Sequence, residues 1–245
     1  MTAGLLYLSV RPQRDAADAE YASFREAARL GVDELAQHDL VAQPLPDDTF
    51  DRFSGIFIGG SPFNVADPES TKPEAQRRVE DDLVRIATAA LENRTAALFT
   101  CYGIGVVTRL LGGEVTRAFP ESTGPTVIDL TEGGRADPVF GALANRFTAF
   151  TAHKEGTATV PPGATLLAQN EACPVQAYRA GERLYATQFH PEPTGKAFTE
   201  RMTFYRNDGY FDVNDFDGVA GRVLAASVTE PARMLHAFAS RFGTR

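Results

Sequence analysis

The chain has 245 residues, of which 43% are hydrophobic and 23% are charged, and its formal net charge is −8. These proportions are ordinary for a globular protein, so they exclude a disordered or fibrous chain and favour one domain over residues 1–245. The acidic balance provides no basic field for a phosphate backbone, so we expect no nucleic-acid partner. Met1 to Leu8 has no basic leader and no apolar stretch is long enough to cross a bilayer, so we expect no membrane association and a cytoplasmic location.

The first half of the sequence alternates short apolar runs with amphipathic ones, which predicts alternating strands and helices. We expect strands at 5–10, 40–42, 55–58 and 96–99, and helices at 16–30, 73–91 and 106–111. Gly112 and Gly113 follow the last of these helices, at the position where glycine usually ends a helix.

The second half is first rich in strand formers and then in helix formers. We expect strands at 126–130, 165–168, 174–179 and 183–189 with a hairpin turn at 180–182, then helices at 199–207, 213–226 and 231–242. We interpret 194–245 as a C-terminal helical extension. The whole pattern predicts an α/β fold, flavodoxin-like, with a mostly parallel central sheet, helices on both faces and a small antiparallel β extension. Ligands of such folds bind at the carboxyl ends of the strands.

Cys101 lies at one such end, between a predicted strand and a predicted helix. The amino end of a helix and a nearby imidazole both lower a thiol pKa, and a sharp turn at this point exposes the side chain and aims backbone amides at a reacting carbonyl. Gly103 permits the close packing of such a turn. A cysteine alone is more often a buried structural thiol, and this is how we interpret Cys173, the second of two cysteines.

His190 is the best placed of the four histidines to act with Cys101, because it follows a predicted strand. Pro191 stiffens the next position, so Glu192 can face the same way as the imidazole. A carboxylate there fixes the ring tautomer and favours the imidazolium.

Two motifs resemble those of the class I (triad-type) glutamine amidotransferases. Cys101-Tyr102-Gly103 is similar to the family's Cys-x-Gly elbow, and residues 188–192 read Gln-Phe-His-Pro-Glu as in the family. The resemblance covers about residues 4 to 200 and is closest to stand-alone homologues of the GMP synthase amidotransferase domain. It implies a catalytic triad of Cys101, His190 and Glu192. The run Gly-Gly-Ser-Pro at 59–62 is similar to the family's glycine loop, which implies an oxyanion hole formed by the amides of Gly60 and Tyr102.

The resemblance also implies a pocket for the substrate. Residues 150–155 resemble the family segment that lines the glutamine pocket, so His153 is a candidate pocket residue, together with Gly59, Gly103 and Gly105. Gly105 stands where the family has a glutamine that holds the substrate, and Phe99 stands where the family has glycine. Both departures concern the pocket rather than the triad.

The predicted function is hydrolysis of the γ-amide of glutamine through a glutamyl thioester. One alternative is a γ-glutamyl peptidase-like hydrolase with a larger leaving group, and another is a non-catalytic partner-binding subunit. We expect a small-molecule substrate, and the candidate partner is a separate synthetase subunit. The chemistry needs no cofactor, and the sequence contains no ligand spacing typical of a metal site, so we expect neither.

Overall fold

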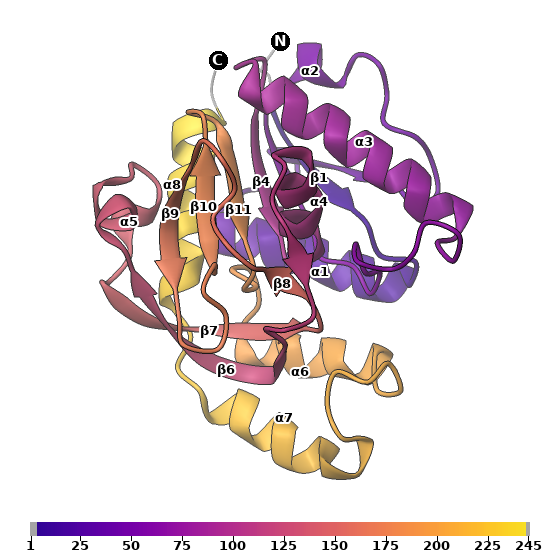
Figure 1. The fold of residues 1–245 in the computed structure, drawn as a ribbon, viewed down its shortest axis with the longest axis vertical. Coiled ribbons are helices and arrows are strands. Elements are labelled where there is room, and N and C mark those ends of the chain that lie inside the picture. Colours follow the sequence, from indigo (N-terminus) through magenta and orange to yellow (C-terminus); the bar gives the residue numbers. More distant parts are fainter. Residues whose placement is uncertain (1–3, 244–245) are drawn as a thin grey trace.

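The computed structural model describes residues 4–243, and a nine-stranded sheet is its centre (Figure 1). The strands are ordered β2-β1-β3-β4-β11-β10-β9-β6-β7. Their bounds are β1 Gly4–Ser9, β2 Leu35–Asp39, β3 Phe53–Ile58, β4 Ala96–Thr100, β6 Glu121–Leu130, β7 Arg146–His153, β9 Ala164–Gln169, β10 Ala177–Ala180 and β11 Leu184–Thr187. A separate pair joins β5 Val115–Thr116 to β8 Gly156–Thr157.

The sheet has a parallel half and an antiparallel half. Strands β2, β1, β3, β4 and β11 pair in parallel, whereas β10, β9, β6 and β7 follow as antiparallel neighbours. Parallel neighbours need crossover connections, which the helices supply, and short turns suffice for antiparallel ones. The predicted fold class, with its antiparallel extension, is confirmed.

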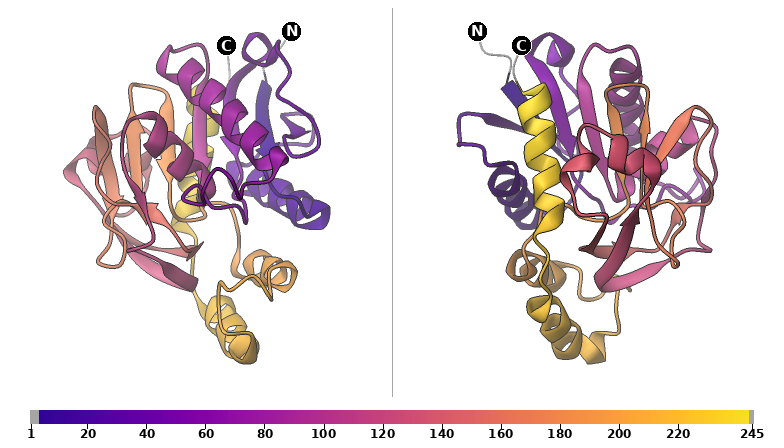
Figure 2. Two further views of the ribbon diagram at one scale, coloured as in Figure 1. Left: turned by 45° about the vertical axis from the view of Figure 1, so that its right-hand side comes forward. Right: turned by 90° about the vertical axis from the view of Figure 1, so that its left-hand side faces the viewer.

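Helices cover both faces of the parallel half (Figure 2). One face packs against α3 and α4, and the other packs against α1 and α8. The helices are α1 Arg14–Ala28, α2 Thr49–Arg52, α3 Glu74–Leu91, α4 Tyr102–Leu110, α5 Glu132–Ala136, α6 Gly195–Phe204, α7 Phe216–Ala225 and α8 Glu230–Phe242, with short 3₁₀ helices at Phe140–Ala142 and Val213–Asp215. Among residues 4–243, no helix combines the length and the apolar character needed to cross a membrane.

The alternation of side chains along the strands builds the two cores. In β1, Leu6 and Leu8 join the cluster under α3 and α4, while Leu5 and Tyr7 join the cluster under α1 and α8. A strand covered on both faces needs apolar residues at every position, which is why this segment reads as a continuous hydrophobic run.

Helices α6 and α7 lie below the sheet in Figure 1, across the end where the parallel strands finish. A third apolar cluster joins them to β7 through Phe150, Phe198, Met202 and Val223. This arrangement encloses the carboxyl edge of the sheet with residues from the predicted C-terminal extension.

Several elements differ from the sequence-based prediction, among them α2, α5, β5 and β8, which were not predicted. The second strand is Leu35–Asp39 rather than 40–42, because an edge strand buries few side chains and lacks a hydrophobic run, while residues 40–42 form a turn. Strand β7 was not predicted, and α4 begins at Tyr102 rather than at 106. The early start of α4 places Cys101 directly at the amino end of a helix.

Candidate active site

Cys101 forms the turn between β4 and α4. Its backbone has φ 51° and ψ −104°, a left-handed conformation that is strained for a residue with a Cβ. Its N–H donates to Thr187 O at 2.8 Å, which ties the turn to the end of β11. The side chain is 8% exposed, and the thiol lies 3.9 Å from Ala152 O. The geometry is that of a nucleophile elbow, which presents a side chain above the edge of a sheet.

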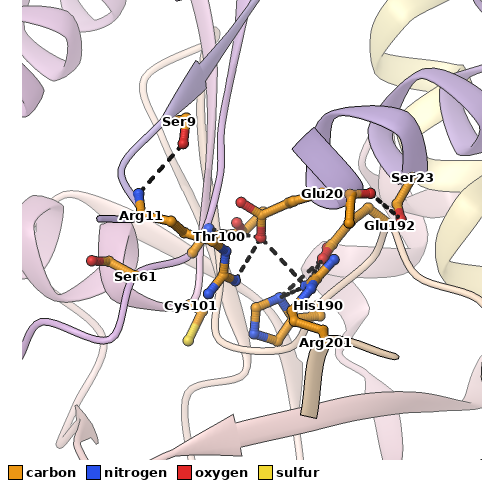
Figure 3. Close-up of polar contacts among 12 residues, drawn as sticks. Ser9, Arg11, Glu20, Ser23, Ser61, Thr100, Cys101, His190, Glu192 and Arg201 are labelled. Atoms are coloured by element: carbon orange, nitrogen blue, oxygen red, sulfur yellow. Dashed lines mark hydrogen bonds and ion pairs between the residues drawn. The ribbon is translucent and has the colours of Figure 1, made fainter. Parts of the chain in front are cut away.

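His190 is brought to the same edge by β11 and by a backbone bridge to β7. Its N–H donates to Phe150 O at 2.9 Å. Its Nδ1 lies 3.2 Å from Glu192 Oε1. A Cβ built on Gly60 would lie 2.8 Å from His190 Cε1 and 3.5 Å from Cys101 Cβ. The imidazole ring and the cysteine side chain therefore both lie next to Gly60. The three residues of the predicted triad therefore lie together, as Figure 3 shows.

The electrostatics of this group favour a charged imidazole. Burial lowers the pKa of His190, but the charge of Glu192 and the neighbouring Cys101 outweigh it and raise that pKa to about 9. Burial alone would raise the pKa of Glu192, yet Arg201 and His190 hold it well below its usual range. At neutral pH the site thus holds an imidazolium that can give a proton to a leaving group.

A buried ionic network of Arg11, Glu20 and Arg201 contacts the triad through Glu192 (Figure 3). Arg201 Nη1 donates to Glu192 Oε1 at 2.5 Å and lies 3.3 Å from Glu20 Oε1. Glu20 also accepts from Arg11 Nη2 at 2.6 Å and from Tyr7 Oη at 2.7 Å. Removing one member of such a group leaves its partners as uncompensated buried charges.

Sequence analysis missed Arg11, Glu20 and Arg201. Two of these residues lie on buried helix faces. Arg201 shares the buried face of α6 with Phe198 and Met202, and Glu20 is fully buried within α1. A charged residue at a buried helical position needs a partner, and this requirement points to the network.

Gly59 and Gly60 pass close behind the triad. A Cβ on Gly59 would lie 2.2 Å from Glu20 Oε2, and one on Gly60 would lie 2.9 Å from Arg11 Nη2, so neither position has room for a side chain. The Gly60 N–H donates to Glu20 Oε1 at 3.2 Å in this structure. Its role as an oxyanion donor stays a prediction, because this amide must first leave Glu20.

Tyr102 is the first residue of α4, where a backbone N–H has no intrahelical acceptor. Its side chain points away from the thiol and donates to Glu80 Oε1 at 2.8 Å. Gly103 packs against β4, because a Cβ there would lie 3.0 Å from Phe99 Cβ. The Tyr102 amide and Gly103 are thus placed as the elbow interpretation requires, and their roles stay predictions.

A hollow of about 330 Å³ with several polar side chains in its wall lies on one side of Cys101 and includes Gly105, His153 and Gln188. The space that a side chain at Gly105 would enter is occupied: a Cβ there would lie 3.0 Å from Val65 Cγ2 and 3.7 Å from Glu155 Oε1. This chain therefore fills the place of the family glutamine with other groups.

His153 borders this hollow, but both of its ring nitrogens have protein partners. Nδ1 lies 2.9 Å from Glu155 O and Nε2 lies 2.8 Å from Glu121 Oε2. Burial raises the pKa of Glu121, but His153 outweighs this effect and holds that pKa below its usual range. His153 is placed at the predicted pocket, and its contact with substrate stays a prediction.

Two groups of buried side chains bring three ligand-type atoms within 4.8 Å of one another: Glu20, His190 and Glu192, and Glu121, His153 and Cys173. Within each group the carboxylates already have ion-pair partners in the protein. The carboxylates therefore have partners among the described residues, and the expectation of no metal remains a prediction.

Residues 20–207 match the family model described as glutamine amidotransferase class-I. The chain belongs to this family. Among curated proteins it is 29% identical over 150 residues to "GMP synthase [glutamine-hydrolyzing]" of Thermus thermophilus, a match that takes in 61% of this chain and 26% of that protein. The chain thus spans about a quarter of that relative's length. Membership of this family indicates an enzyme of the glutamine amidotransferase type.

Solved structures show the same amidotransferase fold. A glutamine amidotransferase from Thermotoga maritima superposes with a TM-score of 0.72 at 14% identity, covering 98% of both chains. A glutamine amidotransferase from Methylobacillus flagellatus has a TM-score of 0.70 at 16% identity, and the match covers 100% of this chain and 96% of the other.

Proposed function

We propose that this class I glutamine amidotransferase hydrolyses the γ-amide bond of glutamine or a γ-glutamyl compound through a glutamyl thioester on Cys101. The observation that carries the proposal is the buried His190–Glu192 pair beside a cysteine at the amino end of α4. A helix amino end and an imidazolium both stabilise a thiolate, which is the form that attacks.

The steps follow from the placement of the groups. The Cys101 thiolate adds to the γ-carbonyl carbon, and the oxyanion is held by the amide of Tyr102 and, after it leaves Glu20, by that of Gly60. The carbon–nitrogen bond then breaks as His190 gives its proton to the leaving nitrogen. Water, deprotonated by His190, attacks the thioester, and the glutamate leaves with regeneration of the thiolate.

The proposal is tested by incubating the protein with glutamine and with γ-glutamyl dipeptides and measuring released glutamate, ammonia and amine. We expect glutamate release that is lost in Cys101→Ala. Ammonia from glutamine supports glutaminase chemistry, and amine from dipeptides supports the peptidase-like alternative. Release that persists in Cys101→Ala contradicts the thioester on Cys101. Silence with every substrate contradicts the hydrolase and favours a non-catalytic partner-binding subunit.

A separate synthetase subunit is the partner proposed for the glutaminase reaction. The support is that the relatives are named GMP synthases and that this chain spans about a quarter of the length of one of them. The chemistry also requires a reduced Cys101, which favours a cytoplasmic location. The test is co-purification of a synthetase whose ammonia supply depends on Cys101.

A further inference from the structure

A second, apolar hollow adjoins the candidate site on the side of His190. It has a volume of about 430 Å³, and both Cys101 and His190 line it. Much of its wall comes from α6 and the segment that follows: Phe198, Met202, Tyr205, Tyr210 and Phe211.

The two arginines at this hollow are paired with buried carboxylates. Arg11 is paired with Glu20 at 2.6 Å, and Arg201 is paired with Glu192 and Glu20. Both side chains are about 5% exposed, and Arg11 Nε and Arg201 Nε and Nη2 have no hydrogen-bond partner among residues 4–243. The surface that remains for a ligand is aromatic and aliphatic, which fits an apolar group.

The hollow on the other side of Cys101 is different in character. Lys154, Glu155 and Gln188 line it, and the Gln188 Oε1 atom is buried with no hydrogen-bond partner among residues 4–243. Polar groups suit the charged amino and carboxylate ends of a glutamyl unit. Cys101 therefore lies between a space with several polar groups and one lined mainly by apolar side chains, a layout that suits attack on a bond joining a polar acyl part to an apolar amine.

His190 gives the direction in which the leaving group departs. Its ring lies 5.8 Å from the Phe198 ring, on the wall of the apolar hollow. His190 lines this hollow and not the one on the other side of Cys101, so a nitrogen that takes its proton lies next to the apolar side. Ammonia needs no such space, whereas a substituted amine does.

We propose that the apolar hollow is a leaving-group subsite, and that the preferred substrates are γ-glutamyl amides of primary amines with an aromatic or other large apolar substituent. The inference rests on the hydrolysis proposed above and adds the substrate class. In the reaction, the amide carbon–nitrogen bond breaks, the amine leaves with the proton from His190, and water releases glutamate from Cys101.

The test compares γ-glutamyl-phenethylamide with γ-glutamyl-methylamide and glutamine, by glutamate release at varied substrate concentration. Because burying an aromatic side chain in an apolar site is strongly favourable, we expect kcat/KM to be at least about tenfold higher for the phenethylamide than for the methylamide. If the protein hydrolyses glutamine but its kcat/KM for the phenethylamide is equal to or lower than that for the methylamide, the subsite is refuted and the proposed hydrolase stands.

Variants locate the effect. Met202→Ala and Phe211→Ala should each lower the phenethylamide to methylamide ratio of kcat/KM, because both side chains line the hollow. Phe204→Ala is the matched control: Phe204 is 40% exposed at the end of the same helix, outside the hollow, and its loss should leave the ratio unchanged. Because Met202 is buried, its replacement could destabilise the fold, so thermal unfolding of each variant is measured. Phe211 is only half-buried, so its variant tests the hollow independently of any loss of stability.

Binding separates failure of the subsite from failure of the chemistry. Calorimetry with Cys101→Ala measures the affinity for γ-glutamyl-phenethylamide without turnover. If the ligand binds, Met202→Ala weakens that binding, and the unchanged protein cleaves no substrate, then the subsite is supported and the proposed hydrolase is refuted. Absence of binding together with absence of cleavage refutes both.

Discussion

Glu192→Gln should lower the pKa of His190. The rise of this pKa from 6.5 to about 9 corresponds to roughly 3 kcal/mol in favour of the imidazolium, at about 1.4 kcal/mol for each pH unit. Burial opposes the charged ring, and Glu192 is the first of the groups that overcome this burial. A glutamine at 192 keeps the shape and an acceptor for Nδ1 but removes the charge. We therefore expect the His190 midpoint to fall by at least about one pH unit.

The same change should alter the pH dependence of stability. Because folding raises the pKa of His190, its protonation stabilises the folded chain below pH 6.5, and this contribution is lost as the pH rises through about 9. In Glu192→Gln the free energy of unfolding should therefore fall less between pH 6.5 and about 9 than it does in the unchanged protein. The variant should also be less stable near neutral pH, because Arg201 loses one of its two carboxylate partners and keeps only Glu20.

The assay is an NMR titration of the His190 ring between pH 5 and 10, with chemical denaturation at several pH values. Glu200→Gln is the matched control, because it removes one carboxylate from the exposed face of α6, where Glu200 lies 3.8 Å from Lys196. A His190 midpoint that stays near 9 in Glu192→Gln would refute the assignment of Glu192 as the source of the raised pKa.

Three further results are expected. Gly60→Ala should lower kcat/KM by about 100-fold, because its Cβ would come within 2.8 Å of His190 Cε1 and displace the ring. Glu20→Gln should lower the free energy of unfolding by roughly 3–5 kcal/mol in denaturation experiments, because two buried arginines lose their shared carboxylate. A glutamine-analogue diazoketone should label Cys101 and spare Cys173 by mass spectrometry, because burial raises the pKa of the Cys173 thiol to about 12.

Control variants test whether the first two effects depend on the position that is changed. Gly221→Ala adds a Cβ in open space and should keep full activity. Glu200→Gln should change stability by less than about 1 kcal/mol, since its ion pair is exposed. Activity retained in Gly60→Ala, stability retained in Glu20→Gln, or equal labelling of both cysteines would each contradict the corresponding interpretation.

Much of the fold could be predicted because the parallel strands are buried on both faces. Segments such as 55–58 and 96–99 are continuous apolar runs, and a run of this kind identifies a strand without knowledge of its neighbours. The edge strand β2 buries mainly Leu35, so its sequence carries little signal. Strand β7 was missed because it has no continuous apolar run and its buried positions do not alternate strictly, so neither strand pattern is clear in its sequence.

The placement of the site was also accessible from sequence, but its electrostatics were not. Cys101 and His190 follow predicted strands, and this is enough to bring them to one edge. The partners of Glu192 come from elsewhere in the chain: Arg201 from α6, and through it Glu20 from α1. Sequence periodicity gives the face of each helix, but it does not indicate which charged residue meets which.

The hydrogen bond from Cys101 N–H to Thr187 O makes the reactive turn depend on two distant strands. Thr100 and Thr187 are register partners, so β4 must meet β11 before the cysteine acquires its final conformation. Pairings between segments so far apart in sequence form late and slowly in folding. During refolding, thiol reactivity at position 101 should therefore return with the last long-range contacts rather than with the early helices, which makes it a direct reporter of completed assembly.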